Sequence, residues 1–328
     1  SWTILVLSPT FESILVKVDE KVGDKTKIVQ EHKIISYGYR VVSKYPELTK
    51  PYKSYSATDI NDNVALKFLQ ALKDEEEWIM NVIKTNNPIN MSVDDLTNFN
   101  NAINCHICGK QLGNDRVRDH DHYTGKYRGA AHNDCNLHYS IDPDKYKIPV
   151  FFHNLRGYDS NFIIQQIAKV ADKINVIPNT MDKYISFAMD RFEFKDSCQF
   201  LQSSLEKLAE SLNKENGDYK ILSSEFNGKI DLLIQKGVYP YEYMDSIDRF
   251  NEDKLPPKTA FYSSLTEENI TDDDYDRAQK VWKEYDIKNL GDYHDLYLKT
   301  DVCLLADIFE RFRDISLNLY KLDPAHYY

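Results

Sequence analysis

Four candidate metal ligands, arranged as two short pairs, constrain the middle of this chain more than any other feature. Cys105 and Cys108 form the first pair, and His132 and Cys135 form the second. Each spacing lets both ligands reach one ion from a single turn, and thiolates with imidazole are the donors that tetrahedral Zn²⁺ prefers. We therefore expect a small module stapled by structural zinc. Two other histidines compete for the place of His132: His106 and His138.

A second group of ionisable residues lies between these pairs. The chain reads Asp119-His120-Asp121-His122, and Asn136 directly follows the last zinc ligand. A carboxylate and an amide oxygen can hold a hard cation such as Mg²⁺, while a neutral histidine beside it deprotonates water. This combination predicts a metal-dependent nuclease of the ββα type. The alternative is that the histidines are exposed polar residues of a turn.

Together these motifs resemble the recombination endonuclease VII family of zinc-containing His-Me finger nucleases. The resemblance covers residues 105–136 and implies that the four paired residues bind zinc. It also implies that Asp119 and Asn136 bind the catalytic Mg²⁺, with His120 as general base and His122 assisting. One position departs from the family, which usually has a cysteine where this chain has the histidine of the second pair.

The overall composition restricts the class of protein. The 328 residues carry a net charge of −11, with a pI near 5.3. This charge argues against a broad basic DNA-binding surface, but not against a nuclease, whose acidic site is neutralised by divalent metal. No apolar run is long enough to span a membrane, so no membrane partner is expected. The cysteine usage favours an intracellular, reducing compartment.

Hydrophobic patterns along the chain predict a mixture of strands and helices, hence an α/β or α+β fold. We expect strands over residues 3–7, 13–18, 33–42, 148–152, 174–177, 184–187 and 191–196. The first two strands are joined around residues 8–12. We expect helices over residues 64–84, 92–102 (N-cap Ser92 with Asp95 at N3), 160–170, 204–212, 271–284 and 293–320. The segment 217–258 is rich in turns and is expected to extend over the surface.

Candidate catalytic residues follow one predicted strand and lie on the last predicted helix. Asn154, Tyr158 and Asp159 come directly after the strand over residues 148–152. Tyr297 and Asp301 are four residues apart, so they share one face of a helix. Hydrolysis of a phosphodiester by two metals requires several carboxylates gathered around the ions, and a tyrosine near the attacking water can orient it.

These residues resemble exonuclease motifs II and III of family B DNA polymerases, in the protein-primed branch. That branch includes the polymerases of Polinton/Maverick mobile elements and of linear viral or mitochondrial plasmid DNAs, and its members carry an endonuclease VII-like insert. The resemblance implies an RNase H-like 3′–5′ exonuclease fold with a small inserted zinc-stapled module. Further matching stretches are residues 148–163, 184–187, 196–197, 204–208, 237–244 and 322–328.

The same resemblance implies the roles of individual residues and the partners. Glu12, Asp159 and Asp301 would converge to hold Mg²⁺ or Mn²⁺. The phenol of Tyr297 would assist catalysis. The single-stranded 3′ end of DNA would be contacted by three residues: Asn154, Ser204 and Leu205. A terminal protein and a polymerase domain are further expected partners.

Two departures from the family affect this hypothesis. Motif I reads Asp-Phe-Glu in the family and Thr10-Phe11-Glu12 here, so one metal is expected to bind poorly. No polymerase palm motif occurs, so we expect the amino-terminal portion of a DNA polymerase. Its exonuclease domain would comprise residues 1–101 and 146–328, with the insert at 102–145. The alternatives are a His-Me finger endonuclease acting on branched DNA and a catalytically inactive DNA-binding remnant.

Overall fold

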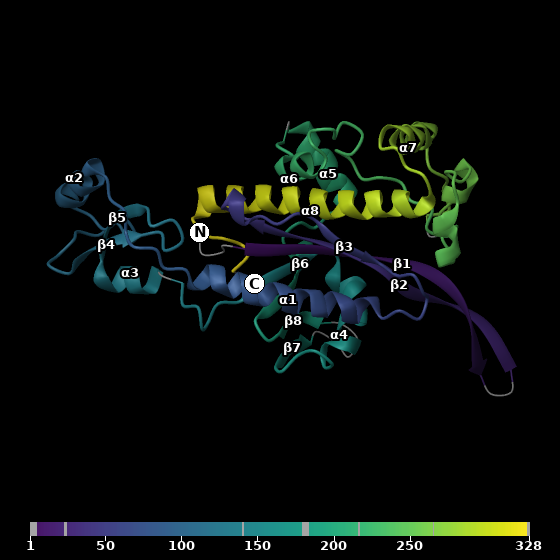
Figure 1. Ribbon diagram of the computed structural model, residues 1–328, viewed down its shortest axis with the longest axis horizontal. Helices are drawn as coiled ribbons and strands as arrows, with labels where there is room; N and C mark the ends of the chain where they lie inside the picture. Colours follow the sequence, from purple (N-terminus) through teal and green to yellow (C-terminus); the bar gives the residue numbers. More distant parts are fainter. Residues whose placement is uncertain are drawn as a thin grey trace. The chain divides into compact units, whose positions relative to one another are not determined.

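The computed structural model describes residues 5–22, 25–139, 141–178, 184–215, 217–264 and 266–326. Residues 3–4 of the first predicted strand and residues 327–328 of the last matching stretch lie outside these ranges. The chain divides into two compact units (Figure 1). The first combines the residues up to 71 with those from 148 onward, and the second comprises residues 72–147.

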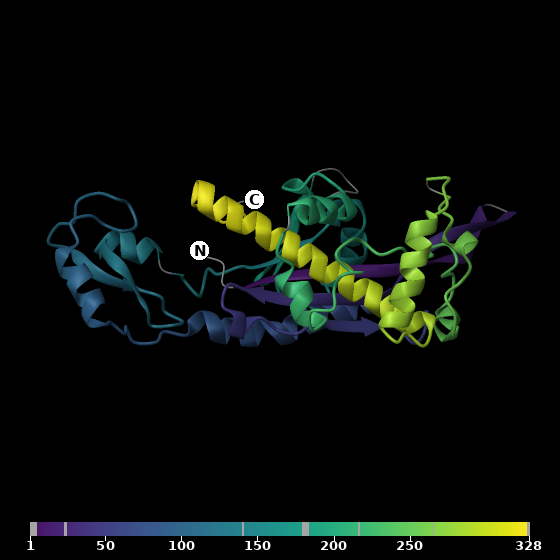
Figure 2. The same cartoon turned by 90° about the horizontal axis from the view of Figure 1, so that it is seen from above.

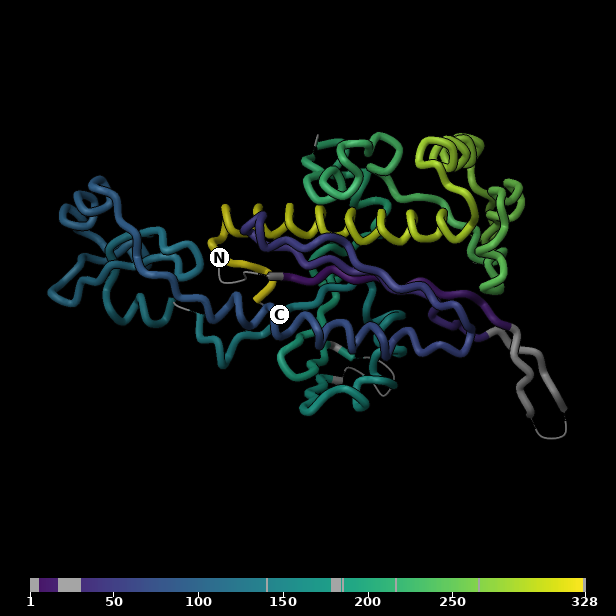
Figure 3. The backbone as a smooth tube through the Cα atoms, viewed as in Figure 1, coloured from purple at the N-terminus to yellow at the C-terminus, as the bar shows by residue number. Residues whose placement is uncertain are grey.

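A seven-stranded mixed sheet forms the centre of the first unit as described, in the order β3-β2-β1-β6-β9-β8-β7. The three early strands lie together on one side of this sheet and the four later strands on the other, and the two groups meet where β1 pairs with β6; Figure 3 traces the backbone. Strand β1 pairs antiparallel with β2 and parallel with β6, and β6 pairs parallel with β9. The expected mixed α/β class is confirmed. The strands are β1 (Leu5–Val22), β2 (Lys25–Ser43), β3 (Lys53–Ser56), β6 (Ile148–Phe152), β7 (Ile174–Pro178), β8 (Tyr184–Met189) and β9 (Phe192–Asp196).

Strand β1 is continuous, so the prediction of two strands joined around residues 8–12 is wrong. It pairs with β2 over its whole length, with one register shift between Glu12 and Ser13. Its other neighbour, β6, pairs with it at Leu7. Proline is tolerated in a strand where its missing N–H faces no ladder partner. Pro9 lies beyond the pairing with β6, which explains why it does not break the strand.

The helices begin and end close to the predicted residues. The helix predicted from residue 160 begins at Asp159, and its N-cap is Tyr158. Among the described residues, none of the helices is long and apolar enough to cross a membrane. The helices of the first unit are α1 (Val64–Lys84, shared with the second unit), α4 (Asp159–Ile167), α5 (Leu205–Lys214), α6 (Lys220–Glu225), α7 (Asp272–Glu284) and α8 (Leu290–Tyr320).

Helices α1 and α8 cover opposite faces of the sheet. Successive side chains of a strand point to opposite faces. In β6, the ring of Phe151 packs on Phe309 of α8 with centroids 4.1 Å apart. The next residue, Phe152, packs on Phe68 of α1 at 5.8 Å. Figure 2 shows α8 running along the sheet. The side chains of this one long helix therefore lie both near the edge of the sheet and near its centre.

The segment 217–258 does not simply extend over the surface, which corrects that prediction. It contains α6, and Leu222 and Tyr239 are buried. The carboxylate of Asp307 on α8 accepts the backbone N–H groups of Ile221 and Leu222, each at 2.9 Å. These long-range bonds, invisible in a local pattern, attach the segment to the core.

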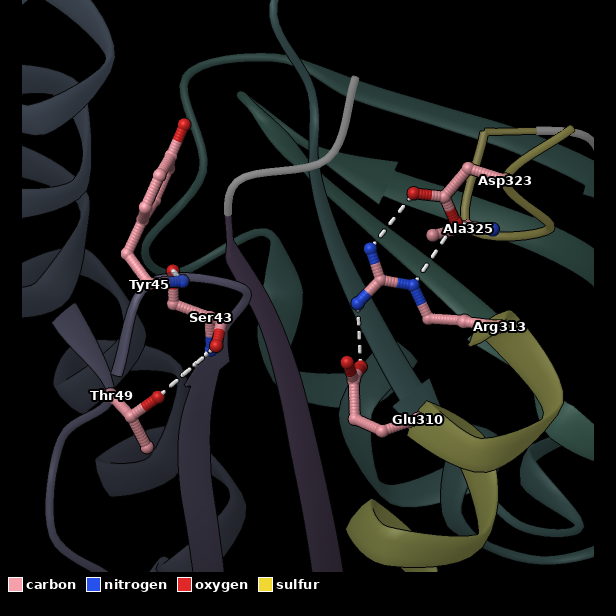
Figure 4. A network of polar contacts seen from close by, with 7 residues as sticks. All are labelled: Ser43, Tyr45, Thr49, Glu310, Arg313, Asp323 and Ala325. Atoms are coloured by element: carbon pink, nitrogen blue, oxygen red, sulfur yellow. Dashed lines mark hydrogen bonds and ion pairs between the residues drawn. The ribbon is translucent and has the colours of Figure 1, made fainter. Parts of the chain in front are cut away.

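A buried ion-pair network fixes the residues that follow α8 (Figure 4). The guanidinium of Arg313 donates to both carboxylate oxygens of Asp323, at 3.0 and 2.8 Å, and to Glu310 at 2.5 Å. Asp323 also accepts the N–H of Ala325, whose carbonyl accepts a bond from Lys195 of β9 at 2.9 Å. The chain after α8 is therefore held against the sheet.

The second unit is a β-hairpin flanked by two short helices. The predicted capping box of Ser92 and Asp95 is confirmed. The guanidinium groups of Arg116 and Arg118 lie over the ring of Phe99, at 4.6 and 5.1 Å from its centroid, and so join the hairpin to the first helix. The elements are α2 (Val93–Asn101), β4 (Arg116–His120), β5 (Tyr127–His132) and α3 (Asn133–Tyr139).

Candidate functional site

A cavity of about 350 Å³ in the first unit brings together most of the predicted exonuclease residues. Strand β1 supplies Glu12, and the chain after β6 supplies Asn154. The first turn of α4 supplies Asp159, the start of α5 supplies Leu205, and the middle of α8 supplies Asp301. Five elements that are distant in the sequence therefore meet at one site.

Two predicted residues do not line this cavity. Ser204 is the N-cap of α5, and its hydroxyl accepts the backbone N–H of Lys207 at 3.4 Å. Tyr297 is buried, with its hydroxyl 2.8 Å from the hydroxyl of Tyr241, which does line the cavity. Tyr297 also forms a side-chain hydrogen bond with Asp301, so it acts on the site through both Tyr241 and Asp301.

The loop that carries Asn154 is shaped by a buried carboxylate. Asn154 has a left-handed backbone, with φ of 69°. The carboxylate of Asp196, at the end of β9, accepts the N–H groups of Asn154 and Arg156 at 2.9 and 3.1 Å. A Cβ at Gly157 would lie 2.4 Å from the side-chain oxygen of Asn154, so a larger residue there would displace the Asn154 side chain.

The three carboxylates of the cavity are buried, and their charged forms would be stabilised by additional positive charge. Glu12, Asp159 and Asp301 are all buried, at 7%, 7% and 3% exposure. Burial, reinforced by Asp301, raises the pKa of Glu12 to about 8. Burial also raises the pKa values of Asp159 and Asp301. One oxygen of Asp301, Oδ1, is buried without a hydrogen-bond partner. A divalent cation would fit this donor set because it stabilises the charged carboxylates.

Glu12, Asp159 and Asp301 line one cavity as candidate cation ligands. Among the described residues, one group of three or more candidate ligands has all of its ligand atoms within 4.8 Å of one another, and it is the cysteine and histidine cluster of the second unit. The three carboxylates are not part of that group. A single ion between them would need water or substrate oxygens to complete its coordination.

Sequence reasoning missed several residues of the cavity. The ammonium of Lys236 lies 3.3 Å from Oδ2 of Asp301. Both Lys236 and Tyr241 lie in the turn-rich segment, where no periodic pattern marks them. His153 immediately precedes Asn154, and that adjacency was an available signal. Its Nε2 donates to the carbonyl of Ser203 at 2.9 Å, and burial lowers its pKa, so it remains neutral.

The second unit holds a candidate zinc site of three cysteines and one histidine. The ligand atoms of Cys105, Cys108, His132 and Cys135 lie within 4.8 Å of one another. His132 Nδ1 is 3.5 Å from Cys108 Sγ and 3.7 Å from Cys135 Sγ, while its Nε2 donates to the carbonyl of Gln111 at 2.9 Å. A zinc-binding histidine typically has such a second bond, which fixes the tautomer and leaves the other nitrogen facing the ion.

The two competing histidines face other partners. His106 Nε2 lies 2.8 Å from Oδ2 of Asp119. His138 Nδ1 lies 2.8 Å from the carbonyl oxygen of Asp134 on its own helix. His132 is therefore the fourth ligand that the geometry favours.

Asp119, which the sequence assigned to Mg²⁺, is the centre of a buried ion pair. Its side chain is 1% exposed, and Arg128 donates to both oxygens, at 2.7 and 2.9 Å. Although burial opposes ionisation, the hydrogen bonds from His106 and Arg128 lower the pKa of Asp119. Both oxygens already accept hydrogen bonds, so a metal at this position would have to share them with Arg128 and His106 or displace those residues.

The remaining residues of the endonuclease motif lie nearby in the second unit. His120 Nε2 donates to the carbonyl of Asn87 at 3.2 Å, and its ring centroid is 4.9 Å from that of His122. Burial, with the neighbouring His120, lowers the pKa of His122. Asn136 is half-buried on α3, directly after the last candidate zinc ligand.

Two known protein families match this chain, one over the region of each candidate site. Residues 139–325 match the family model of DNA polymerase type B, organellar and viral, and residues 82–147 match that of recombination endonuclease VII. Neither curated proteins nor solved structures gave a match. The first match includes Asp159 and Asp301 but does not reach Glu12, and the second includes the whole candidate zinc site. Both families act on DNA, which makes DNA the implied partner. Because the polymerase match spans more than half of the sequence, the chain belongs to the organellar and viral family of type B DNA polymerases.

Proposed function

We propose that the first unit is a metal-dependent 3′–5′ exonuclease that shortens single-stranded DNA ends during DNA replication. The observation that carries this proposal is the cavity in which buried Glu12, Asp159 and Asp301 meet Asn154 and Leu205. An RNase H-like architecture is part of the same proposal, as are a terminal protein and a polymerase domain as partners.

Residues that line or adjoin the cavity can perform each part of such a reaction. Glu12 and the free oxygen of Asp301 would hold Mg²⁺ or Mn²⁺, which supplies a Lewis acid and an activated water when bound. Burial raises the pKa values of Tyr241 and Tyr297, so both phenols keep their protons. Tyr241, which lines the cavity, can donate to water or phosphate, and Tyr297 hydrogen-bonds Tyr241 from behind. Asn154 presents an amide at the rim of the site.

The start of α5 would position the DNA end. Leu205 places an apolar side chain in the cavity against which a terminal base can pack. Ser204 caps the same helix, so its hydroxyl fixes the backbone that carries Leu205. In this arrangement Ser204 contributes to DNA positioning by orienting the N-terminal end of α5.

The proposal is tested by incubating a 5′-labelled linear single strand with the protein and Mg²⁺ or Mn²⁺, beside a covalently closed single-stranded circle. We expect stepwise shortening of the linear strand. Asp301→Asn should reduce the rate by at least about 100-fold, because loss of a metal ligand removes several kcal/mol of transition-state stabilisation. The matched control is Asp314→Asn, the same substitution at an exposed position of α8. Equal rates for Asp301→Asn and the unsubstituted protein would reject this site.

The endonuclease alternative is favoured by the family match over residues 82–147. It predicts opening of the closed circle, and His120→Ala should abolish that opening while leaving end-trimming unchanged. For this chemistry Asp119 would have to exchange Arg128 for the ion. The inactive-remnant alternative predicts that neither substrate is cleaved and that Thr10→Asp restores nothing.

A further inference from the structure

We propose that the exonuclease cavity takes a single divalent cation, with the ammonium of Lys236 occupying the place of a second. This inference rests on the proposed function, because it concerns the metal content of the same site. It differs from the two-metal mechanism expected from the resemblance.

Lys236 brings a permanent positive charge to the carboxylates. Its Nζ lies 3.3 Å from Oδ2 of Asp301, and the Asp301 side chain is almost completely buried. The ammonium and the carboxylate form a charge-assisted contact within the cavity that Glu12 also lines. A cation that is covalently part of the chain cannot be displaced by Mg²⁺.

Thr10 removes the ligand that a second ion would need. Thr10 and Glu12 are two residues apart on β1, and both line the cavity. A threonine hydroxyl is neutral and cannot replace a carboxylate as an anionic ligand. Three carboxylates and one ammonium leave two negative charges, which one divalent cation neutralises. A second ion would leave the buried site with excess positive charge.

The free oxygens of the site are also sufficient for one ion. Asp301 directs Oδ2 to Lys236, while its Oδ1 is buried and has no partner. Glu12 faces the same cavity, and its carboxylate interacts electrostatically with both Asp301 and Lys236. Mg²⁺ commonly binds through one or two carboxylates and completes its shell with water and phosphate oxygens.

The test counts bound Mn²⁺ by electron paramagnetic resonance on the full zinc-loaded chain. The same titration on Glu12→Gln/Asp301→Asn gives the number of ions bound elsewhere, and the difference is the content of the cavity. We expect a difference of one for the unsubstituted protein. Thr10→Asp/Lys236→Met, which has four carboxylates and no ammonium, should raise the difference to two.

Each outcome distinguishes the inference from the proposed function. A difference of two in the unsubstituted protein would overturn the inference and leave the exonuclease proposal intact. A difference of zero would overturn both. A value of one that persists in a folded Thr10→Asp/Lys236→Met protein would show that Thr10 and Lys236 do not set the number. Circular dichroism checks the folding of that variant, and Thr10→Asp alone, which keeps the contact of Lys236, provides the second measurement.

Discussion

Replacement of Glu12 by glutamine should stabilise the metal-free protein at alkaline pH. Burial, with Asp301 nearby, raises the pKa of Glu12 from 4.5 to about 8. Between these two values the unfolded chain has lost a proton that the folded chain retains, so the free energy of unfolding falls as the pH rises. Above about pH 8, the folded protein bears the full free-energy cost of ionising the buried Glu12. Glutamine carries no charge and avoids it.

The size of the effect follows from the shift in pKa. Each unit corresponds to about 1.4 kcal/mol, so an isolated carboxyl with this shift would lose about 4–5 kcal/mol. Asp159 and Asp301 also have raised pKa values and share the proton with Glu12, which reduces the part that one substitution recovers. We therefore expect Glu12→Gln to gain about 2–3 kcal/mol at pH 9, or roughly 4–12 °C in Tm for a unit of this size.

Thermal unfolding followed by circular dichroism measures this gain. The buffer is freed of divalent cations with a chelating resin before zinc-loaded protein is added, because a soluble chelator would also remove zinc. The gain should be much smaller at pH 5, which lies just above the unfolded pKa of 4.5, and should vanish below that value, where Glu12 is protonated in both states. Glu31→Gln, an exposed substitution on β2, is the matched control and should show no such pH dependence. A gain that is absent at pH 9, or equal at pH 5 and pH 9, would refute the reasoning.

Three further predictions concern other parts of the molecule. Arg313→Met should lower the free energy of unfolding by about 3–5 kcal/mol in urea titrations, because it removes the guanidinium that neutralises the buried carboxylate of Asp323; a loss below about 1 kcal/mol would contradict the buried network. Thr10→Asp should accelerate trimming of a labelled single strand by about tenfold or more, since it restores a carboxylate to the cavity, and an unchanged rate would show that Thr10 does not limit the reaction. Cys105→Ser should abolish stoichiometric zinc in metal analysis, whereas Cys198→Ser, outside the cluster, should retain it.

Local patterns predicted most elements because their causes are local. The helix over residues 64–84 and the strand over residues 148–152 have the predicted bounds, since each is defined by the periodicity of its apolar residues. The continuity of β1 was not predictable in this way. Whether Pro9 interrupts a strand depends on which neighbouring strand faces its nitrogen, and that is a property of the assembled sheet.

The candidate sites show the same division. The pairing of cysteines identified a zinc module, but three histidines remained open as the fourth ligand. Their hydrogen bonds distinguish them: His132 faces the thiols, whereas His106 faces Asp119. The resemblance to the polymerase exonuclease motifs also selected Glu12 and Asp301, and the structure places both in one cavity.

The sequence by itself determined which kinds of ligand this chain offers: soft donors in one module, and carboxylates that follow strands or share a helix face. Only the tertiary structure decided how those charges are balanced. It placed Lys236 beside Asp301 in one unit and Arg128 around Asp119 in the other. The physical reason is that the charge state and availability of a carboxylate depend on burial and on the nearest opposite charge, and in the exonuclease cavity that charge comes from a distant part of the chain.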